Sequence, residues 1–155
     1  FEIDRGRDRL KCSVEPGLKA WADKHLVRSL MQNLISNAVK YSAGRQPARI
    51  EVGAVREPDG TVFFVRDNGT GFDMAQAGQL FQPFSRLHSS REFPGDGIGL
   101  ATVRRIVLRH GGRIWAEGRP NAGACFFFTL PVRPSGEEPG QDPPPGSLQP
   151  GFSSA

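Results

Sequence analysis

The clearest pattern of apolar and polar positions lies between Asp23 and Ser42. Apolar residues recur there at intervals of three and four: Leu26, Val27, Leu30, Met31, Leu34, Ile35 and Ala38. This spacing places them on one face of an α-helix, and Asp is a favourable residue at the helix N-cap. The pattern predicts a helix that begins after Asp23 and runs to about Ser42.

Apolar runs beside turn residues predict the strands of the first half. The expected strands are residues 10–14, a short segment at 19–21, and residues 50–55 and 61–65. The first alternates with a period of two and ends at a Glu-Pro-Gly turn, and the last two flank Glu57-Pro58-Asp59-Gly60, which is the signature of a β-hairpin.

The second half predicts two further helices and two further strands. A short helix is expected after Asp73, and residues 84–97 lack periodicity and indicate a loop or lid. A helix over 98–110 should end at Gly111-Gly112, and strands should follow at 113–117 and 124–132. The order of elements predicts an α/β (α+β) sandwich, with helices packed on one face of a mixed sheet.

Composition divides the chain into two parts. Residues 1–133 have the length and apolar content of one domain, whereas residues 134–155 consist mainly of Pro, Gly, Ser and Gln and are expected to be a disordered tail. The opening residues 1–4 resemble the remnant of a strand or junction. The chain is therefore expected to be a fragment.

Charge and cysteines limit the classes of function. The net charge is +4, and the tail holds Glu137, Glu138 and Asp142 without Lys or Arg, so residues 1–133 carry +7. No aromatic-basic interleaving or nucleic-acid module accompanies this surplus, and we expect no nucleic-acid partner. Cys12 and Cys125 lie far apart without metal-ligand spacing, which favours reduced core thiols and a cytoplasmic location. No apolar run approaches about 20 residues, so no membrane contact is expected of this fragment.

Asn33, Asn37 and Tyr41 lie four residues apart on one edge of the long predicted helix, and Lys40 lies beside them. An asparagine carbonyl is a suitable ligand for Mg²⁺, and a lysine adds positive charge near phosphates. The alternative is that the asparagines cap an edge of the core while Lys40 points to water.

Asp67 ends an apolar strand and enters a loop in which Gly69 and Gly71 allow close approach of the backbone to a ligand. A carboxylate there needs donors. The exocyclic amino group of adenine is one such donor. The alternative is a tight turn in which Asp67 accepts hydrogen bonds from its own backbone.

Gly95, Gly97 and Gly99 alternate just before a predicted helix, whose N-terminus can hold phosphate oxygens. The spacing is not the dinucleotide fingerprint, because Leu100 takes the place of the third glycine, and no Gly-Lys pair of a P-loop exists in the chain. A flexible loop that leads into a helix is the alternative.

Phe81 and Phe84 bracket Pro83 before the predicted lid, and Arg86 follows. The aromatic rings favour a packing role, and Arg86 is either a contact to a γ-phosphate or an exposed arginine. The histidines His25, His88 and His110 have no metal-ligand arrangement.

Taken together, the four clusters resemble the N, G1, F and G2 boxes of the ATP-binding catalytic domain of sensor histidine kinases, which belong to the wider family of gyrase, mismatch-repair ATPases and large heat-shock chaperones. The resemblance extends over residues 10–132, and the flanking sequence His110-Gly111-Gly112-Arg113-Ile114-Trp115-Ala116-Glu117 is similar to the kinase regions of phytochrome-like sensors. It implies a Bergerat-type fold, with about five mostly antiparallel strands on about three helices.

The resemblance also implies the ligands, ATP and Mg²⁺, and the residues that contact them. Asn37 is implied as the magnesium ligand, with catalytic roles for Asn37, Lys40 and Arg86. The residues implied to bind nucleotide are Asn33, Asn37, Lys40, Tyr41, Asp67, Gly69, Gly71, Phe84, Gly95, Gly97, Gly99, Leu100 and Thr129, the last of which assists Asp67 through water. Asp96 departs from the pattern because it places an acid between the glycines of the phosphate loop.

Asn33 separates branches of this family, because the hydrolytic members resemble a pattern with Glu at this position, where it acts as general base. Its absence favours phosphate transfer over hydrolysis. No phosphoacceptor histidine pattern is present, so the implied partners are an upstream histidine-bearing dimerisation domain and a response-regulator receiver domain. An anti-sigma-type serine kinase and a non-catalytic nucleotide-sensing module are the alternatives.

Overall fold

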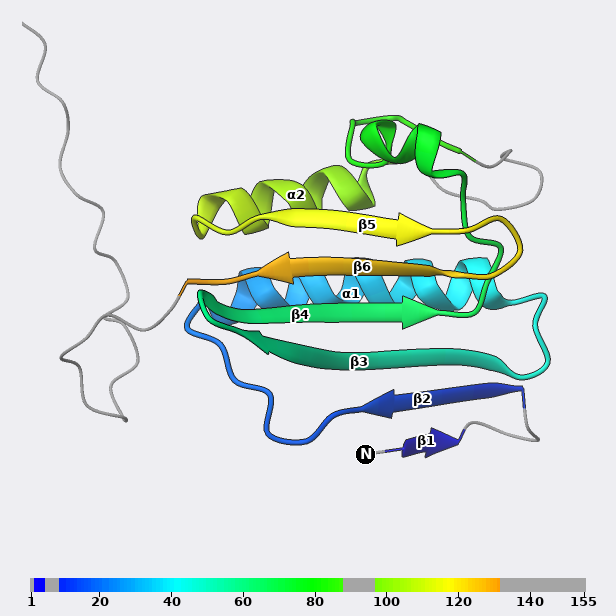
Figure 1. The fold of residues 1–155 in the computed structure, drawn as a ribbon, viewed down its shortest axis with the longest axis horizontal. Helices are drawn as coiled ribbons and strands as arrows, with labels where there is room; N and C mark the ends of the chain where they lie inside the picture. The colour runs from blue at the N-terminus through cyan, green and yellow to red at the C-terminus, as the bar shows by residue number, and fades with distance from the viewer. Residues whose placement is uncertain (1, 5–8, 88–96, 132–155) are drawn as a thin grey trace, which may run out of the picture.

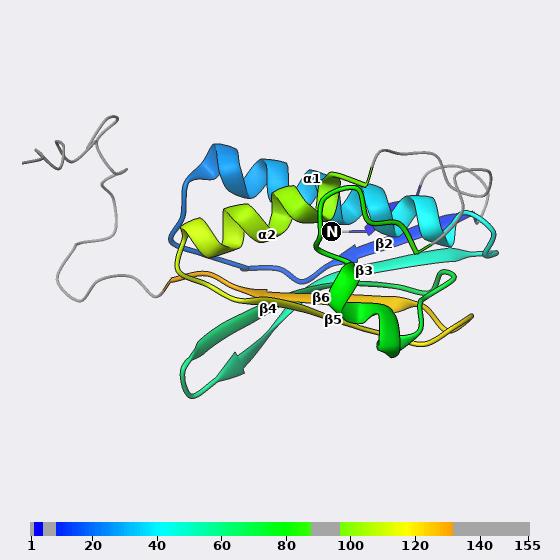
Figure 2. The same cartoon turned by 90° about the horizontal axis from the view of Figure 1, so that it is seen from above.

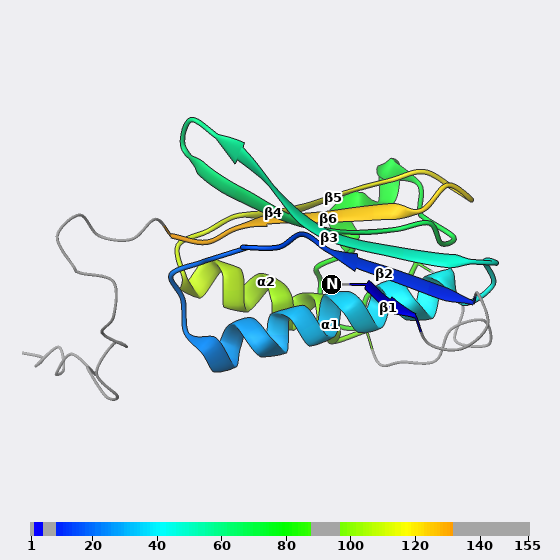
Figure 3. The same ribbon diagram turned by 90° about the horizontal axis from the view of Figure 1, so that it is seen from below.

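A single mixed sheet and two α-helices form the two layers of the molecule. The computed structural model describes residues 2–4, 9–87 and 97–131. In chain order the elements are β1 (Glu2–Asp4), β2 (Leu10–Val14), α1 (Lys24–Ser42), β3 (Ala48–Glu57), β4 (Gly60–Asp67), the 3₁₀ helix η1 (Met74–Gln79), α2 (Gly99–Arg109), β5 (Ile114–Gly118) and β6 (Ala124–Thr129). Both α-helices lie on the same face of the sheet (Figure 2, Figure 3).

The described strands pair in the order β1-β2-β3-β4-β6-β5. β2 and β3 are parallel and are joined by α1, whereas the other neighbouring pairs are antiparallel. The predicted α/β sandwich with a mostly antiparallel sheet is therefore confirmed. The sheet has six strands because the short β1 adds an edge, and η1 is the third, shorter helix.

Helix α1 follows the predicted bounds. The Asp23 carboxylate accepts hydrogen bonds from the backbone N–H groups of His25 at 2.8 Å and Leu26 at 3.0 Å, which satisfies donors that the first turn leaves open. The stripe of Leu30, Leu34 and Ala38 is buried. It packs in one core with residues of the sheet and of α2, among which Val65 and Val103 are 1% and 0% exposed.

The centre of β4, residues 62–65, is apolar at every position because both of its faces are covered. Phe63 belongs to the core beneath the helices and stacks on Phe128 of β6, with ring centroids 5.5 Å apart. On the other face, Phe64 lies 6.3 Å from the ring of Phe127 and beneath the guanidinium of Arg66 at 4.9 Å. This explains why β4 lacks the alternation of a half-exposed strand.

Two predicted strands differ from the structure. Residues 19–21 form no strand, because β1 and β3 already occupy both edges of β2 and the segment crosses the end of the sheet to reach α1 (Figure 1). The last strand ends at Thr129 rather than at Val132, which lies outside the described residues. Phe1 and the predicted tail at 134–155 also lie outside them.

The two cysteines are free, as expected, and Cys125 is buried. Burial raises the pKa of the Cys125 thiol to about 11, so this group stays protonated at neutral pH.

Leu34→Ala tests the packing of α1. The side chain is 1% exposed, so its truncation should lower the free energy of unfolding by about 2–5 kcal/mol. Val39→Ala on the same helix is the control, because Val39 is 40% exposed and its loss should change stability by less than about 0.5 kcal/mol. Urea denaturation measures both. Equal effects of the two substitutions would contradict the assigned buried face.

Candidate functional site

Each of the four clusters contributes residues to one end of the sheet. α1 ends there, β4 ends there at Asp67, and α2 begins there (Figure 1). A small cavity of about 60 Å³ lies between these elements. The residues that line it are Asn37, Tyr41, Asp67, Gly71, Phe72, Leu80, Ser85, Arg86, Leu87, Leu100, Ala124 and Phe126.

Helix α1 supplies one wall of this cavity through Asn37 and Tyr41. The Nζ atom of Lys40 lies 4.6 Å from the centroid of the Tyr41 ring, at the side of the cavity rather than in its lining. Asn33 lies one turn further back, and its Nδ2 donates to the carbonyl of Ser29 at 2.9 Å.

Gly99 brings the start of α2 against this edge of α1. A Cβ atom at position 99 would lie 2.8 Å from Oδ1 of Asn33, closer than such atoms approach in proteins. The N box and the G2 box therefore meet at a contact that glycine permits. The positive end of the α2 dipole points toward this end of the molecule, where it favours anions.

Asp67 is 7% exposed and lies at the end of β4. Its Oδ1 atom accepts a hydrogen bond from the backbone N–H of Gly69 at 2.8 Å. Burial raises the pKa of the Asp67 carboxyl, and hydrogen bonds from the N–H groups of Gly69 and Ala124 partly oppose this rise. The tight turn that was the alternative for this motif is therefore present, and the same carboxylate also lines the cavity.

The loop after Asp67 is held by its neighbours. Thr70 donates its N–H to the carbonyl of Tyr41 at 3.1 Å, and Arg45 donates to the carbonyl oxygens of Gly69 at 3.0 Å and Asn121 at 2.6 Å. Gly71 has a φ of 61°, and a Cβ there would meet the carbonyl of Arg119. The glycines thus allow the loop to fit between α1 and the β5–β6 connection.

The segment before α2 forms a third wall of the small cavity. Ser85, Arg86 and Leu87 line the cavity, and the N–H of Phe84 donates to the carbonyl of Gly97 at 3.2 Å. Gly97 has a φ of 74°, and a Cβ there would lie 2.9 Å from the carbonyl oxygen of Ser85. Gly95, Asp96 and His88 lie outside the described residues.

Phe84 is not part of the cavity lining. Its side chain is 74% exposed, and its φ of 60° turns the chain so that the following residues, rather than Phe84, face the cavity. The predicted nucleotide contact by Phe84 is therefore not supported, and neither is a packing role. Phe81 does pack, edge-on against Phe126 with centroids 6.2 Å apart.

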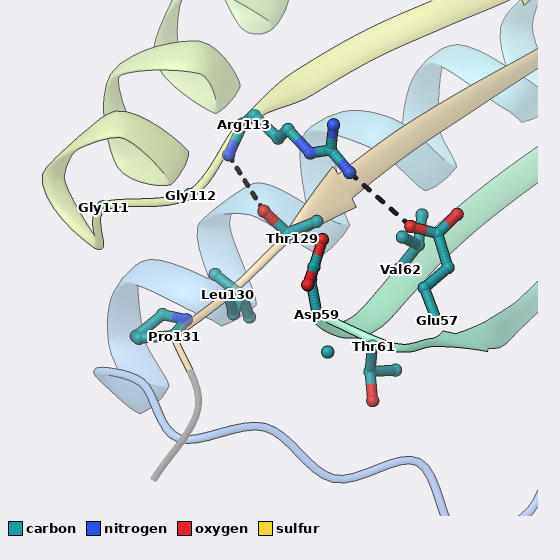
Figure 4. Close-up of a pocket in the computed structure, with 11 residues that line it drawn as sticks. Glu57, Asp59, Thr61, Val62, Gly111, Gly112, Arg113, Thr129, Leu130 and Pro131 are labelled. Carbon is teal, nitrogen blue, oxygen red and sulfur yellow. Dashed lines mark hydrogen bonds and ion pairs between the residues drawn. The ribbon is translucent and has the colours of Figure 1, made fainter. Parts of the chain in front are cut away.

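Thr129 lies at the wrong end of β6 to assist Asp67. Asp67 pairs with Ala124, whereas Thr129 pairs with Val62, five residues away along the strand. The Thr129 hydroxyl instead accepts a hydrogen bond from the N–H of Arg113 at 3.0 Å (Figure 4). The prediction for Thr129 was wrong, because its strand was recognised while the register of that strand was unknown.

Thr129 lines a larger cavity of about 330 Å³ at the opposite end of the sheet (Figure 4). Glu57 and Asp59 contribute carboxylates to it, and Arg113 forms an ion pair with Glu57 at 3.6 Å. The C-terminal end of α2 borders it through Gly111 and Gly112. Two carboxylates and the negative end of a helix dipole disfavour phosphates, so the smaller cavity is the better nucleotide candidate despite its size.

Sequence reasoning missed several apolar walls of the site. Phe72, Leu80 and Phe126 line the cavity, as does Ala124. Phe72 directly follows the glycine loop, and this adjacency was an available signal. Ala124 and Phe126 reach the site only through the pairing of β4 with β6, which no local pattern specifies.

Two further properties concern the described residues only. They contain no group of three or more His, Cys, Asp and Glu side chains arranged to hold a metal ion. None of their helices combines the length and the apolar character that crossing a bilayer requires.

The sequence matches known proteins over most of its length. Residues 22–134 match the family described as histidine kinase-, DNA gyrase B- and HSP90-like ATPase. The chain is 46% identical to the methanogenesis regulatory histidine kinase FilI of Methanothrix harundinacea over 124 residues, which are 79% of this chain and 14% of that protein. It is 46% identical to cyanobacterial phytochrome A of Nostoc sp. over 66% of this chain and 13% of that protein.

These relatives include phytochromes, but they do not single out a phytochrome branch. The sensor protein KdpD of Escherichia coli is 42% identical over a match that covers 79% of this chain and 14% of that protein. The chain thus spans about one seventh of the length of these three curated relatives.

Solved structures agree with this assignment. The mycobacterial sensor histidine kinase MprB superposes with a TM-score of 0.68 at 27% identity, covering 81% of this chain and 84% of that one. The catalytic domain of the histidine kinase ThkA gives a TM-score of 0.63 at 25% identity, covering 79% and 78%. The chain belongs to the family of histidine kinase-, DNA gyrase B- and HSP90-like ATPases, and its structural neighbours are catalytic domains of histidine kinases.

Proposed function

We propose that this domain binds Mg-ATP in the small cavity and transfers the γ-phosphoryl group to a histidine of a dimerisation domain outside this chain. The main support is the convergence of Asn37, Asp67, Arg86 and Leu100, from four separate segments, on one cavity beside the start of α2. In two-component signalling the phosphoryl group would then pass to the receiver domain of a response regulator. We place this domain in the cytoplasm.

Asp67 is suited to recognise adenine. Its carboxylate is buried, and although it accepts hydrogen bonds from Gly69 and Ala124, a carboxylate has sites for more donors. The amino group of adenine supplies a donor, whereas guanine presents a carbonyl acceptor at the corresponding position. Tyr41, Phe72 and Leu100 supply apolar surface for the flat base.

The phosphates fit the side of the cavity next to α2. Backbone N–H groups at the start of this helix attract anions, and Arg86 and Lys40 add positive charge nearby. Asn37 lines the cavity and carries an amide oxygen of the kind that Mg²⁺ prefers. When bound, the ion offsets the charge of the phosphates.

Asn33 supports transfer rather than hydrolysis. Its side chain lies against Gly99 and carries no carboxylate that could remove a proton from water. In the transfer proposed here, the bond between the γ-phosphorus and the bridging oxygen breaks, a phosphorus–nitrogen bond forms to the imidazole, and ADP leaves. The imidazole releases its N–H proton.

Nucleotide binding requires local rearrangement. Binding cavities for small molecules usually measure about 300–1,000 Å³, and this one measures about 60 Å³. Ser85, Arg86 and Leu87 line it and are less buried than the core residues of α1 and β4, so outward movement of this segment would enlarge the cavity at the least cost in core packing. The walls made by α1 and β4 belong to the core and should stay in place.

Asn37→Ala should weaken only the magnesium-dependent part of ATP binding. One lost contact to a charged group corresponds to about 1.5–3 kcal/mol, so the dissociation constant for Mg-ATP should rise by about tenfold or more. With EDTA the variant and the wild type should bind ATP alike. Calorimetry with and without Mg²⁺ measures both, and exposed Ser36→Ala is the control. An unchanged affinity for Mg-ATP would remove Asn37 from the metal site.

The substitution Asp67→Asn should weaken nucleotide binding and at the same time stabilise the fold at neutral pH. Affinity for ATP and ADP should fall about tenfold or more with or without Mg²⁺, because the amide presents a donor or a weaker acceptor to adenine. The pKa of Asp67 is raised in the folded state, so the ionised carboxylate destabilises the fold at neutral pH. The variant should therefore be more stable than the wild type at pH 7. This difference should shrink as the pH falls below the raised pKa and vanish below the ordinary pKa of an aspartate, where the wild-type carboxyl is protonated in both the folded and the unfolded state.

Calorimetric titration and thermal unfolding across pH test the two effects of Asp67→Asn. Asp59→Asn, an exposed carboxylate at the other end of the sheet, is the matched control. Unaltered nucleotide affinity would exclude Asp67 from adenine recognition. A loss of stability at pH 7 would contradict the cost of burying the charge.

Labelled ATP distinguishes the proposed acceptor from its alternatives. Mixed with this chain and a histidine-bearing dimerisation domain, it should yield acid-labile label on that domain, and Asn37→Ala should reduce the yield at least tenfold. The chain alone should not label itself. Acid-stable label on serine of a protein acceptor would indicate an anti-sigma-type kinase, and binding without transfer would indicate a nucleotide-sensing module.

A further inference from the structure

An apolar groove lies at the end of the molecule opposite the nucleotide cavity. It is formed by two adjoining cavities of about 550 Å³ and 400 Å³ that share Lys19, Ala20, Phe63 and Leu130. One wall is the beginning of α1 and the other is the inner face of the sheet. We call it the distal groove; its apolar floor consists of Val27, Met31, Phe63, Phe128 and Leu130.

The rim of the distal groove is basic. Lys19, Lys24 and Arg28 line it, and none of the described residues that line either cavity is acidic. Lys24 and Arg28 lie four residues apart and hence on one side of α1. The neighbouring carboxylate of Asp23 accepts hydrogen bonds from the first turn of the helix and is committed to the cap.

The chain leaves the sheet inside this groove. β6 ends at Thr129, Leu130 belongs to the floor, and Pro131 lines the smaller cavity together with Trp21. In Figure 1 the end of β6 and the segment that precedes α1 lie at the same end of the sheet. Leu130 and Pro131 also line the cavity that holds Glu57 and Asp59, so the sequence after Pro131 is tethered between that acidic cavity and the distal groove. Acidic residues there are repelled by the first and attracted by Lys19 of the second.

The tethered sequence complements the groove in charge. After Arg133 it contains Glu137, Glu138 and Asp142 and no Lys or Arg, and its larger apolar side chains are Leu148 and Phe152. Glu137 follows Pro131 by six residues, which can span up to about 20 Å. Attachment by a short linker corresponds to an effective concentration in the millimolar range, so even weak contacts lead to occupancy.

We propose that residues 134–155 dock in the distal groove of the same chain. Glu137, Glu138 and Asp142 face the basic rim, and Leu148 and Phe152 cover the apolar floor. This interaction is independent of the proposed kinase function, because the groove and the nucleotide cavity share no lining residue.

The two tryptophans provide an internal comparison in the full chain. Trp21 lines the groove, whereas Trp115 stacks on Phe127 at 5.4 Å, on the face of the sheet away from the helices. The triple substitution Glu137→Lys, Glu138→Lys and Asp142→Lys should shift the indole N–H resonance of Trp21 in a ¹H–¹⁵N spectrum and leave that of Trp115 in place. Salt of about 0.5 M should move the wild-type Trp21 resonance in the same direction.

Reversing the charge of the groove rim provides the matched variant. Lys24→Glu and Arg28→Glu by themselves should abolish docking. When they are combined with the triple lysine substitution, docking should be restored, so the effects of the two sets of substitutions on the Trp21 resonance should not be additive. The paired substitutions Ser153→Ala and Ser154→Ala are the neutral control and should move neither resonance.

Two results would overturn the proposal. One is a Trp21 resonance that does not respond to reversal of the acidic residues. The other is a response that weakens when the wild-type protein is diluted about tenfold, because docking within one chain does not depend on concentration whereas docking of a second copy does.

Discussion

The burial of one stripe of α1 is the interaction on which the rest of the structure depends. Leu30, Leu34 and Ala38 are almost fully enclosed between the sheet and α2, so the helix can neither rotate nor slide. Asn37 and Tyr41 lie beside this stripe and are positioned by it. The small cavity is thus bounded on this side by a buried part of the core, and the segment around Arg86 lines its other side.

Close backbone contacts complete the site. Gly69 and Gly71 lie where a side chain would strike Tyr41 and Arg119, and Gly99 lies where one would strike Asn33. These contacts bring Asp67 and the start of α2 to the same cavity as α1. The buried carboxylate of Asp67 then carries a cost, visible in its raised pKa, that a bound base with an amino donor would offset. Under the proposed function, nucleotide recognition and stability of the fold are opposed at this residue.

The two ends of the sheet differ in electrostatic character because the dipole of α2 is positive at its N-terminal end and negative at its C-terminal end. Its N-terminal end faces the small cavity with Arg86 and Lys40 nearby, whereas its C-terminal end borders the larger cavity with Glu57 and Asp59. Size alone would favour the larger cavity. The charge of each end, rather than its volume, decides which one suits phosphates.

The sequence by itself determined the elements whose cause is local. The apolar period and the cap specify α1, the Pro-Asp-Gly turn specifies the β3–β4 hairpin, and the four clusters identify the family. Tertiary structure decided what depends on distant pairing. The register of β4 with β6 places Ala124 opposite Asp67 and Thr129 at the other end of the strand. The left-handed backbone at Phe84 accompanies a ring that is exposed to solvent. A period of two tells which face a strand residue occupies but not which residue of another strand lies opposite, because pairing across a sheet is set by the whole core rather than by neighbours in sequence.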